Sequence, residues 1–285
     1  MIGSLLNFAS LRRSEWICLA FFACVAILSF FIAVPARRRL RLVTLSAAVT
    51  AVLLFLPAAL SSSPGLLVSV IRDWLPAPLI LLGYHAAGRL TFPRPDQSVE
   101  KALLRWDEFF FGLPLLRILS SNYKLPGWLD AALEFSYLQC YVIVPSGIAV
   151  LYLAHQRALA DDYWSVVLPA VFAAYGLTPL FPAQPPRKLP QNSPSLGEPS
   201  PLRMFNLWIH DHASIKFNTF PSGHVAGAVS ASLALMQPMP IAGACYMAVA
   251  AGIMFGSVRG RYHYAADAVL GVVVAAAACL AYALF

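Results

Sequence analysis

The sequence predicts an all-α integral membrane protein with about eight transmembrane helices. Hydrophobic residues make up 59% of the 285 residues and charged residues only 12%, with a mean hydropathy of +0.69. A water-soluble domain of this size does not show that balance. Because an apolar helix of about 20 residues crosses the hydrocarbon core of a bilayer, long uncharged runs indicate spans.

The net charge of +7 does not indicate nucleic-acid binding. The basic residues lie between the hydrophobic runs, as the cluster of Arg37, Arg38, Arg39 and Arg41 does. Basic flanks of this kind are typical of membrane spans and act as topology signals. We therefore expect the membrane as a partner and no nucleic acid, while the oligomeric state stays open.

Five spans are predicted before the middle loop, at residues 16–35, 42–60, 74–88, 135–154 and 163–184. The first has a long uncharged core followed by a basic cluster, so it is interpreted as a retained span and not as a signal peptide. Residues 1–73 are expected to form N-terminal transmembrane helices. Residues 74–285 are expected to form the membrane domain that carries the function.

Two polar stretches interrupt this domain. Residues 89–125 place leucine and phenylalanine close to helical spacing among charged residues, which predicts an amphipathic segment in the membrane interface. Residues 182–221 are rich in proline, which predicts a structured loop with a short helix over 202–212.

A hairpin of two spans is predicted after this loop. Residues 225–258 contain 34 residues without a charge, and one helix of that length would be about 51 Å long, too long for a single crossing. Two prolines and a glutamine at 237–240 predict the turn. His224 enters the first span and His263 follows the second, so both histidines return to the same membrane face. The last span starts at that face.

A histidine and an aspartate begin the last predicted span. His263 and Asp267 are four residues apart, so on a helix the carboxylate can hold the imidazole by a hydrogen bond. Ionisable groups beside a span are costly unless they are paired or face a polar cavity. Together with His224 on the same face, they indicate a functional site, whereas a single histidine there would more simply be an interfacial residue.

Cations are predicted to gather near this group. Arg187 and Lys188 follow the end of a span on a proline-rich loop, and Arg259 and Arg261 precede His263. Regular alternation of the spans puts all of them on one face. A site with two histidines, one carboxylate and several cations suits a phosphate ester.

These residues resemble a known family. "FPSGH" at 220–224 and "GRYHYAADAVLG" at 260–271 resemble the last two motifs, S-G-H and H-x-x-x-D, of the type-2 phosphatidic acid phosphatase (PAP2) superfamily. "FPAQPPR" at 181–187 and "WDEFFFGLP" at 106–114 are similar to segments of the branch that contains inositol phosphorylceramide and sphingomyelin synthases. The resemblance covers roughly residues 74–271 and implies a PAP2-type catalytic helix bundle in the later spans.

The resemblance implies a phosphotransferase that works through a phosphohistidine, without a metal or another cofactor. His263 would attack phosphorus, with Asp267 orienting its ring. His224 would protonate the leaving oxygen and then deprotonate the incoming water or acceptor hydroxyl. The substrate would be a lipid phosphate or phospholipid in the bilayer. The family pattern implies an extracytoplasmic site, whereas a count of basic residues in the loops favours the cytoplasmic face.

The resemblance also implies phosphate ligands, which are expected to be Arg187, Lys188, Ser222, Gly223, Arg259 and Arg261. This chain departs from the family pattern in two motifs. The usual first motif has a lysine seven positions before an Arg-Pro pair, whereas here Lys188 follows Arg187. The usual third motif has an arginine six positions before its histidine, where this chain has Ser257, so Arg259 is taken as the substitute and Arg261 as the second choice.

Alternatives stay open at this stage. His210, Asp211 and His212 could join His224 in a metal site. Hydrolysis of a lipid phosphate and transfer of a phospho-headgroup, as in inositol phosphorylceramide synthases, share one chemistry and differ only in the acceptor. A non-catalytic lipid transporter or scaffold could retain the fold, but a transporter would carry charges at the membrane midplane. Glu134 is expected at the membrane interface.

Overall fold

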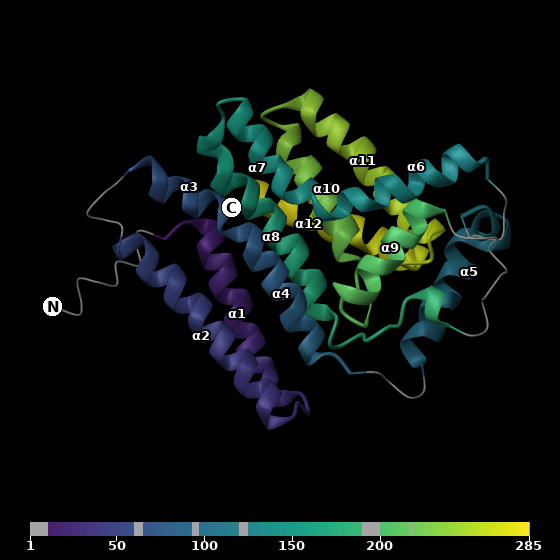
Figure 1. Ribbon diagram of the computed structural model, residues 1–285, viewed down its shortest axis with the longest axis horizontal. Coiled ribbons are helices and arrows are strands. Elements are labelled where there is room, and N and C mark those ends of the chain that lie inside the picture. Colours follow the sequence, from purple (N-terminus) through teal and green to yellow (C-terminus); the bar gives the residue numbers. More distant parts are fainter. Residues whose placement is uncertain are drawn as a thin grey trace.

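The protein is helical throughout the part that the computed structural model describes, residues 11–59, 65–92, 97–119, 125–189, 200–217 and 219–284. These residues contain twelve α-helices and no β-strand. In Figure 1 the N-terminal helices lie on one side of the bundle and α5 (Ser98–Leu119) lies on the other, with the later helices between them. The predicted all-α fold class is confirmed.

The first four helices form the N-terminal part of the bundle. They are α1 (Arg13–Phe31), α2 (Ala36–Ala59), α3 (Leu66–Trp74) and α4 (Pro76–Leu90). α3 and α4 together make one candidate span, Leu66–Leu90. Ion pairs fasten the start of α1 to the end of α3: Arg12 binds Asp73 at 2.6 Å and Arg72 binds Glu15 at 2.7 Å. Both carboxylates are buried. A buried charge left unpaired there would be costly, so these contacts hold the start of α1 against the end of α3.

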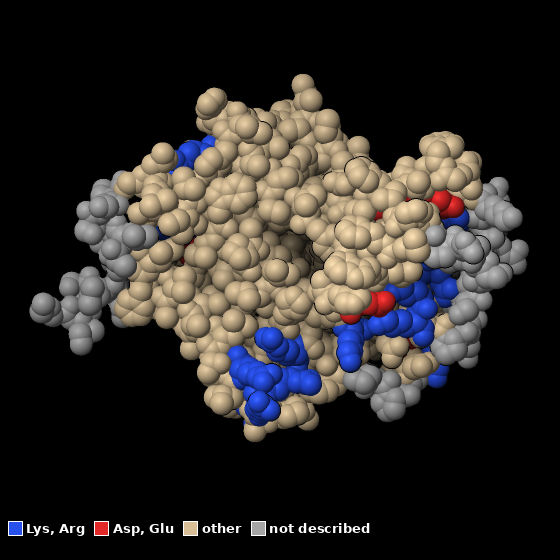
Figure 2. Space-filling view, in the orientation of Figure 1, with Lys and Arg blue, Asp and Glu red and all other residues tan. Residues whose placement is uncertain are grey.

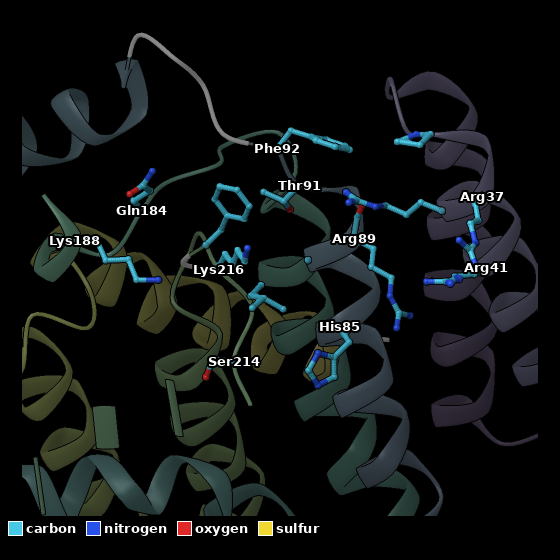
Figure 3. A pocket seen from close by; sticks show the side chains of 15 residues that line it. Arg37, Arg41, His85, Arg89, Thr91, Phe92, Gln184, Lys188, Ser214 and Lys216 are labelled. Carbon is cyan, nitrogen blue, oxygen red and sulfur yellow. The ribbon is translucent and has the colours of Figure 1, made fainter. Parts of the chain in front are cut away.

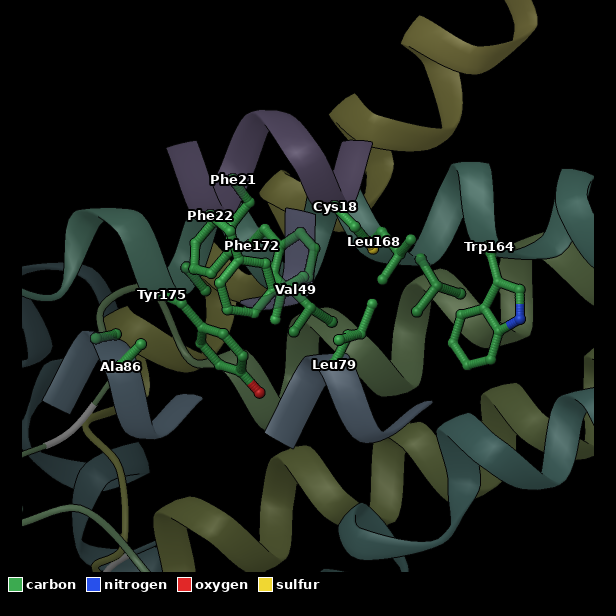
Figure 4. Close-up of a cluster of buried hydrophobic side chains, with 14 of the residues drawn as sticks. Cys18, Phe21, Phe22, Val49, Leu79, Ala86, Trp164, Leu168, Phe172 and Tyr175 are labelled. Carbon is green, nitrogen blue, oxygen red and sulfur yellow. The ribbon is translucent and has the colours of Figure 1, made fainter. Parts of the chain in front are cut away.

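α8 (Ala160–Leu177) is the central helix of the bundle. It packs against α1 and α4 on one side and against α10 and α12 on the other. The rings of Phe21 and Phe172 stack at a centroid distance of 4.0 Å, and Gly83 lies against them, where a Cβ would come within 2.9 Å of Phe21. Figure 4 shows this aromatic group beside Phe22 and Tyr175. Burial of these large rings is the main force that joins α1 to α8.

The predicted helical hairpin is present, although only its second helix is long enough to count as a candidate membrane span. α10 (Gly223–Met236) and α11 (Pro240–Arg259) are joined by a short turn, and α12 (Ala265–Leu284) follows. Pro240 stands at the first position of α11, where a missing N–H costs nothing. A Cβ on Gly243 would meet the backbone of Met236 at 2.5 Å, so glycine permits the close return of the chain.

A bent helix pair precedes α8. α6 (Gly127–Leu138) leads through a short 3-10 turn into α7 (Ile143–Leu153), with a bend of 72° between them. By length and composition, five helical segments of the described chain can each cross a membrane, or six if the bent pair is one span. They are Arg13–Phe31, Ala36–Leu56, Leu66–Leu90, Pro240–Arg259 and Ala265–Leu284. The predicted count of about eight spans is therefore not confirmed by this criterion.

The two polar stretches form shorter helical elements. Residues 89–125 are not one segment, because α4 continues to Leu90 and α5 is interrupted at Gly112, whose φ is 62°. Residues 93–96 and 120–124 of this stretch lie outside the described chain, as do 190–199 of the predicted loop. The short helix expected over 202–212 is present as α9 (Pro201–His212), with Ser200 accepting the Arg203 N–H as its N-cap.

Candidate active site

The start of α10 holds His224 in a capped first turn. Ser222 is fully buried, and its side chain accepts the backbone N–H of Val225 at 3.4 Å. The Ser222 N–H donates to the carbonyl oxygen of Asp267 at 3.1 Å. A Cβ on Gly271 would meet the Ser222 carbonyl oxygen at 2.8 Å, so glycine lets α12 approach this turn closely. The starts of α10 and α12 are therefore fastened directly to each other.

His263 and Asp267 form the predicted pair. Nδ1 of His263 lies 3.1 and 3.2 Å from the two carboxylate oxygens of Asp267. His263 is 3% exposed and Asp267 is 0% exposed. The carboxylate accepts a hydrogen bond, so the proton of His263 is assigned to Nδ1, and Nε2 keeps a free electron pair.

The two histidines face each other. Nδ1 of His224 lies 3.2 Å from Nε2 of His263, which accepts the hydrogen bond in the tautomer assigned above. His224 is half-buried and has Tyr137 and Tyr141 against its ring edge. The structure thus brings together His224, His263 and Asp267, which are separated by up to 43 positions in the sequence.

Arg187 supplies a cation at this group. It belongs to the short 3-10 turn Pro186–Lys188, and its guanidinium lies 5.4 Å from the ring centre of Tyr262. Burial lowers the pKa of Arg187 from its ordinary value. Its Nη1 atom is buried and has no hydrogen-bond partner among the described residues. An anion beside Nη1 would satisfy this donor and offset the cost of burying its charge.

A small cavity joins Arg187 to the histidines. It has a volume of about 10 Å³ and is lined by Tyr84, Pro185, Arg187, His210, Ser214, Ile215, Phe217, Thr219, His224 and His263. Among the predicted phosphate ligands, only Arg187 lines it. Nε2 of His263 and Nη1 of Arg187 belong to residues that face one enclosed space, as attack on a bound phosphate requires.

The other predicted phosphate ligands have different contacts. Arg259 binds Asp130 through Nε at 2.8 Å and Nη2 at 3.2 Å. Arg261 donates to the carbonyl oxygen of Pro186 at 2.8 Å and accepts the Arg187 N–H, so it holds the turn that carries Arg187. Lys188 lines a separate, larger cavity.

Ser222 and Gly223 are also engaged in local contacts. The Ser222 hydroxyl caps α10, and the Gly223 N–H donates to the Thr219 hydroxyl at 2.8 Å. A Cβ on Gly223 would lie 2.8 Å from the ring of Tyr175. In this arrangement the glycine is needed for close packing, and Thr219 is one of the hydroxyl side chains that line the small cavity.

Glu134 has a structural role that the sequence did not reveal. It is 6% exposed and lies at the centre of a network, while its expected position at the membrane interface stays a prediction. Its carboxylate accepts hydrogen bonds from Tyr262 at 2.8 Å, Asn206 at 2.6 Å and Arg203 at 3.1 Å. Burial, followed by the charge of Glu134, raises the pKa of Tyr262. The network holds the chain immediately before His263 between α6 and α9.

His210 has a partner other than a metal ion. Its Nε2 lies 2.9 Å from the Tyr137 hydroxyl, and its ring stacks on Tyr262. Burial, with Arg187 next, lowers the pKa of His210 to about 2, so it is a neutral hydrogen-bonding group. His212 is exposed and contacts the Trp208 carbonyl oxygen. No group of three histidine, cysteine or acidic residues in the described chain is arranged to hold a metal ion.

Asp107 is a second residue whose role the sequence did not reveal. It lies on α5, is 8% exposed, and accepts the backbone N–H groups of Ala265 at 3.1 Å and Ala266 at 2.7 Å. These are the first residues of α12, so Asp107 caps that helix from another element. Burial raises the pKa of Asp107 to about 6, while the two N–H groups oppose the shift. Through this cap, α5 positions His263 and Asp267.

We expect Asp107→Ala to lower kcat by roughly tenfold, because loss of an N-cap costs about 1 kcal/mol and loosens the start of α12. Asp107→Asn keeps one hydrogen-bond acceptor, so its loss in kcat should be smaller. The measurement is kcat with a lipid phosphate, together with the melting temperature in detergent. Glu108→Ala is the control, since Glu108 is the exposed neighbour. Equal kcat values for D107A and E108A would show that the cap has no influence on the site.

The fold and the site describe a helical membrane protein with a buried histidine–histidine–aspartate group beside a cationic cavity. Residues 101–281 match the family model of the PAP2 superfamily, and the chain therefore belongs to that superfamily. The matched region runs from α5 to α12 and contains His224, His263, Asp267 and Arg187. No curated protein and no solved structure shows a significant match. Membership suggests phosphatase or phosphotransferase activity.

Proposed function

We propose that the protein is an integral membrane enzyme that cleaves a lipid phosphate ester through a phosphohistidine. The observation that carries this proposal is the orientation of His263: Asp267 holds Nδ1, Nε2 lies against His224, and His263 lines the small cavity. A carboxylate that holds the ring in this way raises the nucleophilicity of the opposite nitrogen. Arg187 faces the same cavity with an unsatisfied N–H.

The proposed reaction has two steps. Nε2 of His263 attacks phosphorus, the bond from phosphorus to the leaving oxygen breaks, and His224 donates its proton to that oxygen. A water or alcohol then attacks phosphorus, His224 takes the proton, and the electron pair of the P–N bond returns to His263. In-line transfer places phosphorus between the two histidines. Since their nitrogens lie 3.2 Å apart, the rings must separate when the substrate binds.

Headgroup transfer is the second candidate, and one observation favours it. An apolar cavity of about 310 Å³ reaches His224 from between α4, α7, α8 and α10, and Figure 2 shows a hollow in this part of the surface. Tyr84, Val144 and Gly227 are among its lining residues. A lipid alcohol in this cavity would bring its hydroxyl to the general base. Hydrolysis and headgroup transfer of the inositol phosphorylceramide synthase type are therefore both kept as candidate reactions, and an experiment can distinguish them by their products.

We also propose eight crossings. This count adds three spans to the five candidate segments. The added spans are the bent pair α6–α7, α8 and α10, which pack within the same bundle. α10 has only 14 residues, or about 21 Å, so His224 would lie below the membrane surface within reach of a lipid phosphate. The extracytoplasmic position of this face stays a prediction from the family resemblance.

Turnover is expected to continue in the presence of excess chelator, because every role in the proposed reaction belongs to a side chain. Purified protein would be incubated with lipid phosphates, phospholipids and lipid alcohols, with and without EDTA, and scored for free phosphate and for new lipids. Free phosphate supports hydrolysis, and a new phospholipid supports transfer. Activity that disappears with EDTA and returns with a divalent metal would refute the metal-independent mechanism. Absence of all turnover would favour a transporter or scaffold.

A further inference from the structure

A large cavity opens at the same end of the bundle as the histidines. Its volume is about 910 Å³, and it lies between α2, α4 and the loops on either side of α9. Six cationic side chains line it, and we refer to it as the basic cavity: they are Arg37, Arg38, Arg41, Arg89, Lys188 and Lys216. Figure 2 shows basic side chains gathered at this edge of the molecule.

The cations come from four separate parts of the sequence: residues 37–41, Arg89, Lys188 and Lys216. Figure 3 shows Arg37 and Arg41 on one wall and Lys188 on the opposite wall, with Arg89 and Lys216 between them. Arg38 joins two of the walls, because it donates to the carbonyl oxygen of Arg89 at 3.4 Å and lies 5.1 Å from the ring centre of Phe92. A topology signal requires only that cations flank one span. It does not require them to converge on a cavity from several elements.

None of these six cations forms an ion pair with a carboxylate within the described chain. The opposite end of the bundle differs, since Arg12 and Arg157 there bind Asp73, and Arg72 binds Glu15. Like charges that surround one cavity repel one another, and an anion between them removes that cost. The basic cavity is therefore complementary to a ligand with negative charge.

The basic cavity adjoins the small cavity at His263. Ser214, Ile215 and Phe217 line both the basic cavity and the small cavity at His263. Lys188 of the basic cavity directly follows Arg187 of the small one. A phosphate ester held at Arg187 would therefore point its polar substituent into the basic cavity, while the apolar cavity on the other side of His224 takes a lipid chain.

We propose that the basic cavity binds the headgroup of a lipid substrate that carries at least one anionic group besides the scissile phosphate. This inference rests on the proposed function, because it assigns the substrate class of the same site. A lipid monophosphate has no polar group beyond the scissile phosphate and would leave the six cations without a ligand. The substrate class is thus a phospholipid with a second negative charge in its headgroup.

Binding without turnover tests the inference. The melting temperature of the purified protein in detergent is followed while short-chain phosphatidylinositol 4-phosphate, short-chain phosphatidylinositol or inorganic phosphate is added. The two lipids differ by one phosphate group, and inorganic phosphate shows whether the anion alone is sufficient. For the wild type, the concentration that gives half of the maximal stabilisation should be about tenfold lower for phosphatidylinositol 4-phosphate than for phosphatidylinositol. The reason is that phosphate contacts with arginine are charge-assisted and bidentate.

Arg37→Gln/Arg41→Gln is the test variant, and Lys188→Gln/Lys216→Gln, on the opposite wall, is the second. Arg105→Gln is the matched control, since Arg105 is an exposed arginine on α5 that does not line the cavity. Both double variants should lose the preference for the 4-phosphate, and R105Q should keep it. A preference that survives both double variants, or equal stabilisation by inorganic phosphate, would overturn the inference. Preference without any turnover would refute the proposed function, and only the binding of an anionic headgroup in the basic cavity would remain.

Discussion

His263→Ala is expected to abolish turnover, with a loss in kcat of about 10⁴-fold or more, because it removes the proposed nucleophile. The geometry supports this expectation. Asp267 holds Nδ1 at 3.1 Å, so the attacking nitrogen is Nε2, and alanine leaves no group in its place. The measurement is the release of free phosphate, or of a new lipid, from the best substrate of the lipid panel. No phosphorylated protein should be trapped from this variant.

The control for this variant is His155→Asn. His155 is exposed, lies outside the small cavity and has a φ of 58°, a backbone conformation that asparagine tolerates. H155N should keep wild-type turnover. If H263A kept kcat within tenfold of the wild type, His263 would not be the nucleophile and the assignment of the two histidines would have to change.

His224→Ala is expected to slow the cleavage of lipid esters by about 10²- to 10⁴-fold, the range of a positioned general acid. The loss should be smallest for activated aryl phosphates, whose leaving groups need no proton. The physical reason is the position of His224, whose Nδ1 lies 3.2 Å from the attacking nitrogen at the edge of the apolar cavity. The measurement is kcat/KM for a series of esters with leaving groups of graded pKa, which should show a steeper dependence in H224A.

His212→Ala serves as the control here, because His212 is an exposed histidine of α9 on the same side of the molecule and lines none of the three cavities. In H212A, kcat/KM should depend on the pKa of the leaving group as it does in the wild type. A loss in H224A that is equal for good and poor leaving groups would rule out His224 as the proton donor in the first step.

The sequence predicted the part of the site that local rules control. Helical spacing places Asp267 one turn after His263, and the length of the uncharged run at 225–258 requires a hairpin that returns to the face of His224. The structure has both features, with α10 and α11 joined by a turn and the three side chains in hydrogen-bond contact. The grouping of His224, His263 and Asp267 can therefore be predicted from one sequence.

The parts that were not predicted depend on contacts between distant segments. Asp107 caps a helix that begins 158 positions later, and no local pattern marks such a pair. "WDEFFFGLP" was a signal that this segment had a specific role, because it resembled a family motif, but the motif does not say which backbone the carboxylate meets. Glu134 likewise became buried because Arg203, Asn206 and Tyr262 close over it from two other elements.

The cations show the same limit. Spacing along the chain made Arg259 a candidate phosphate ligand, but spacing does not show that Asp130 on α6 reaches its guanidinium. Arg37 and Arg41 have the sequence features of a topology signal, and only the packing of α2 beside α4 reveals the cavity that they share with Lys188 and Lys216. Charge type was readable from the sequence, whereas the partner of each charge was not.

The central claim is that phosphorus is transferred to His263, and trapping the intermediate tests it most directly. H224A would be mixed with an activated aryl phosphate. The first step needs no general acid with this substrate, but the second step still needs His224 as the general base. The phosphorylated protein should therefore accumulate. Mass spectrometry at neutral pH should then find one phosphoryl group, labile to acid, on the peptide that contains His263. A phosphoryl group on any other residue, or continued turnover with no phosphorylated protein, would contradict the account.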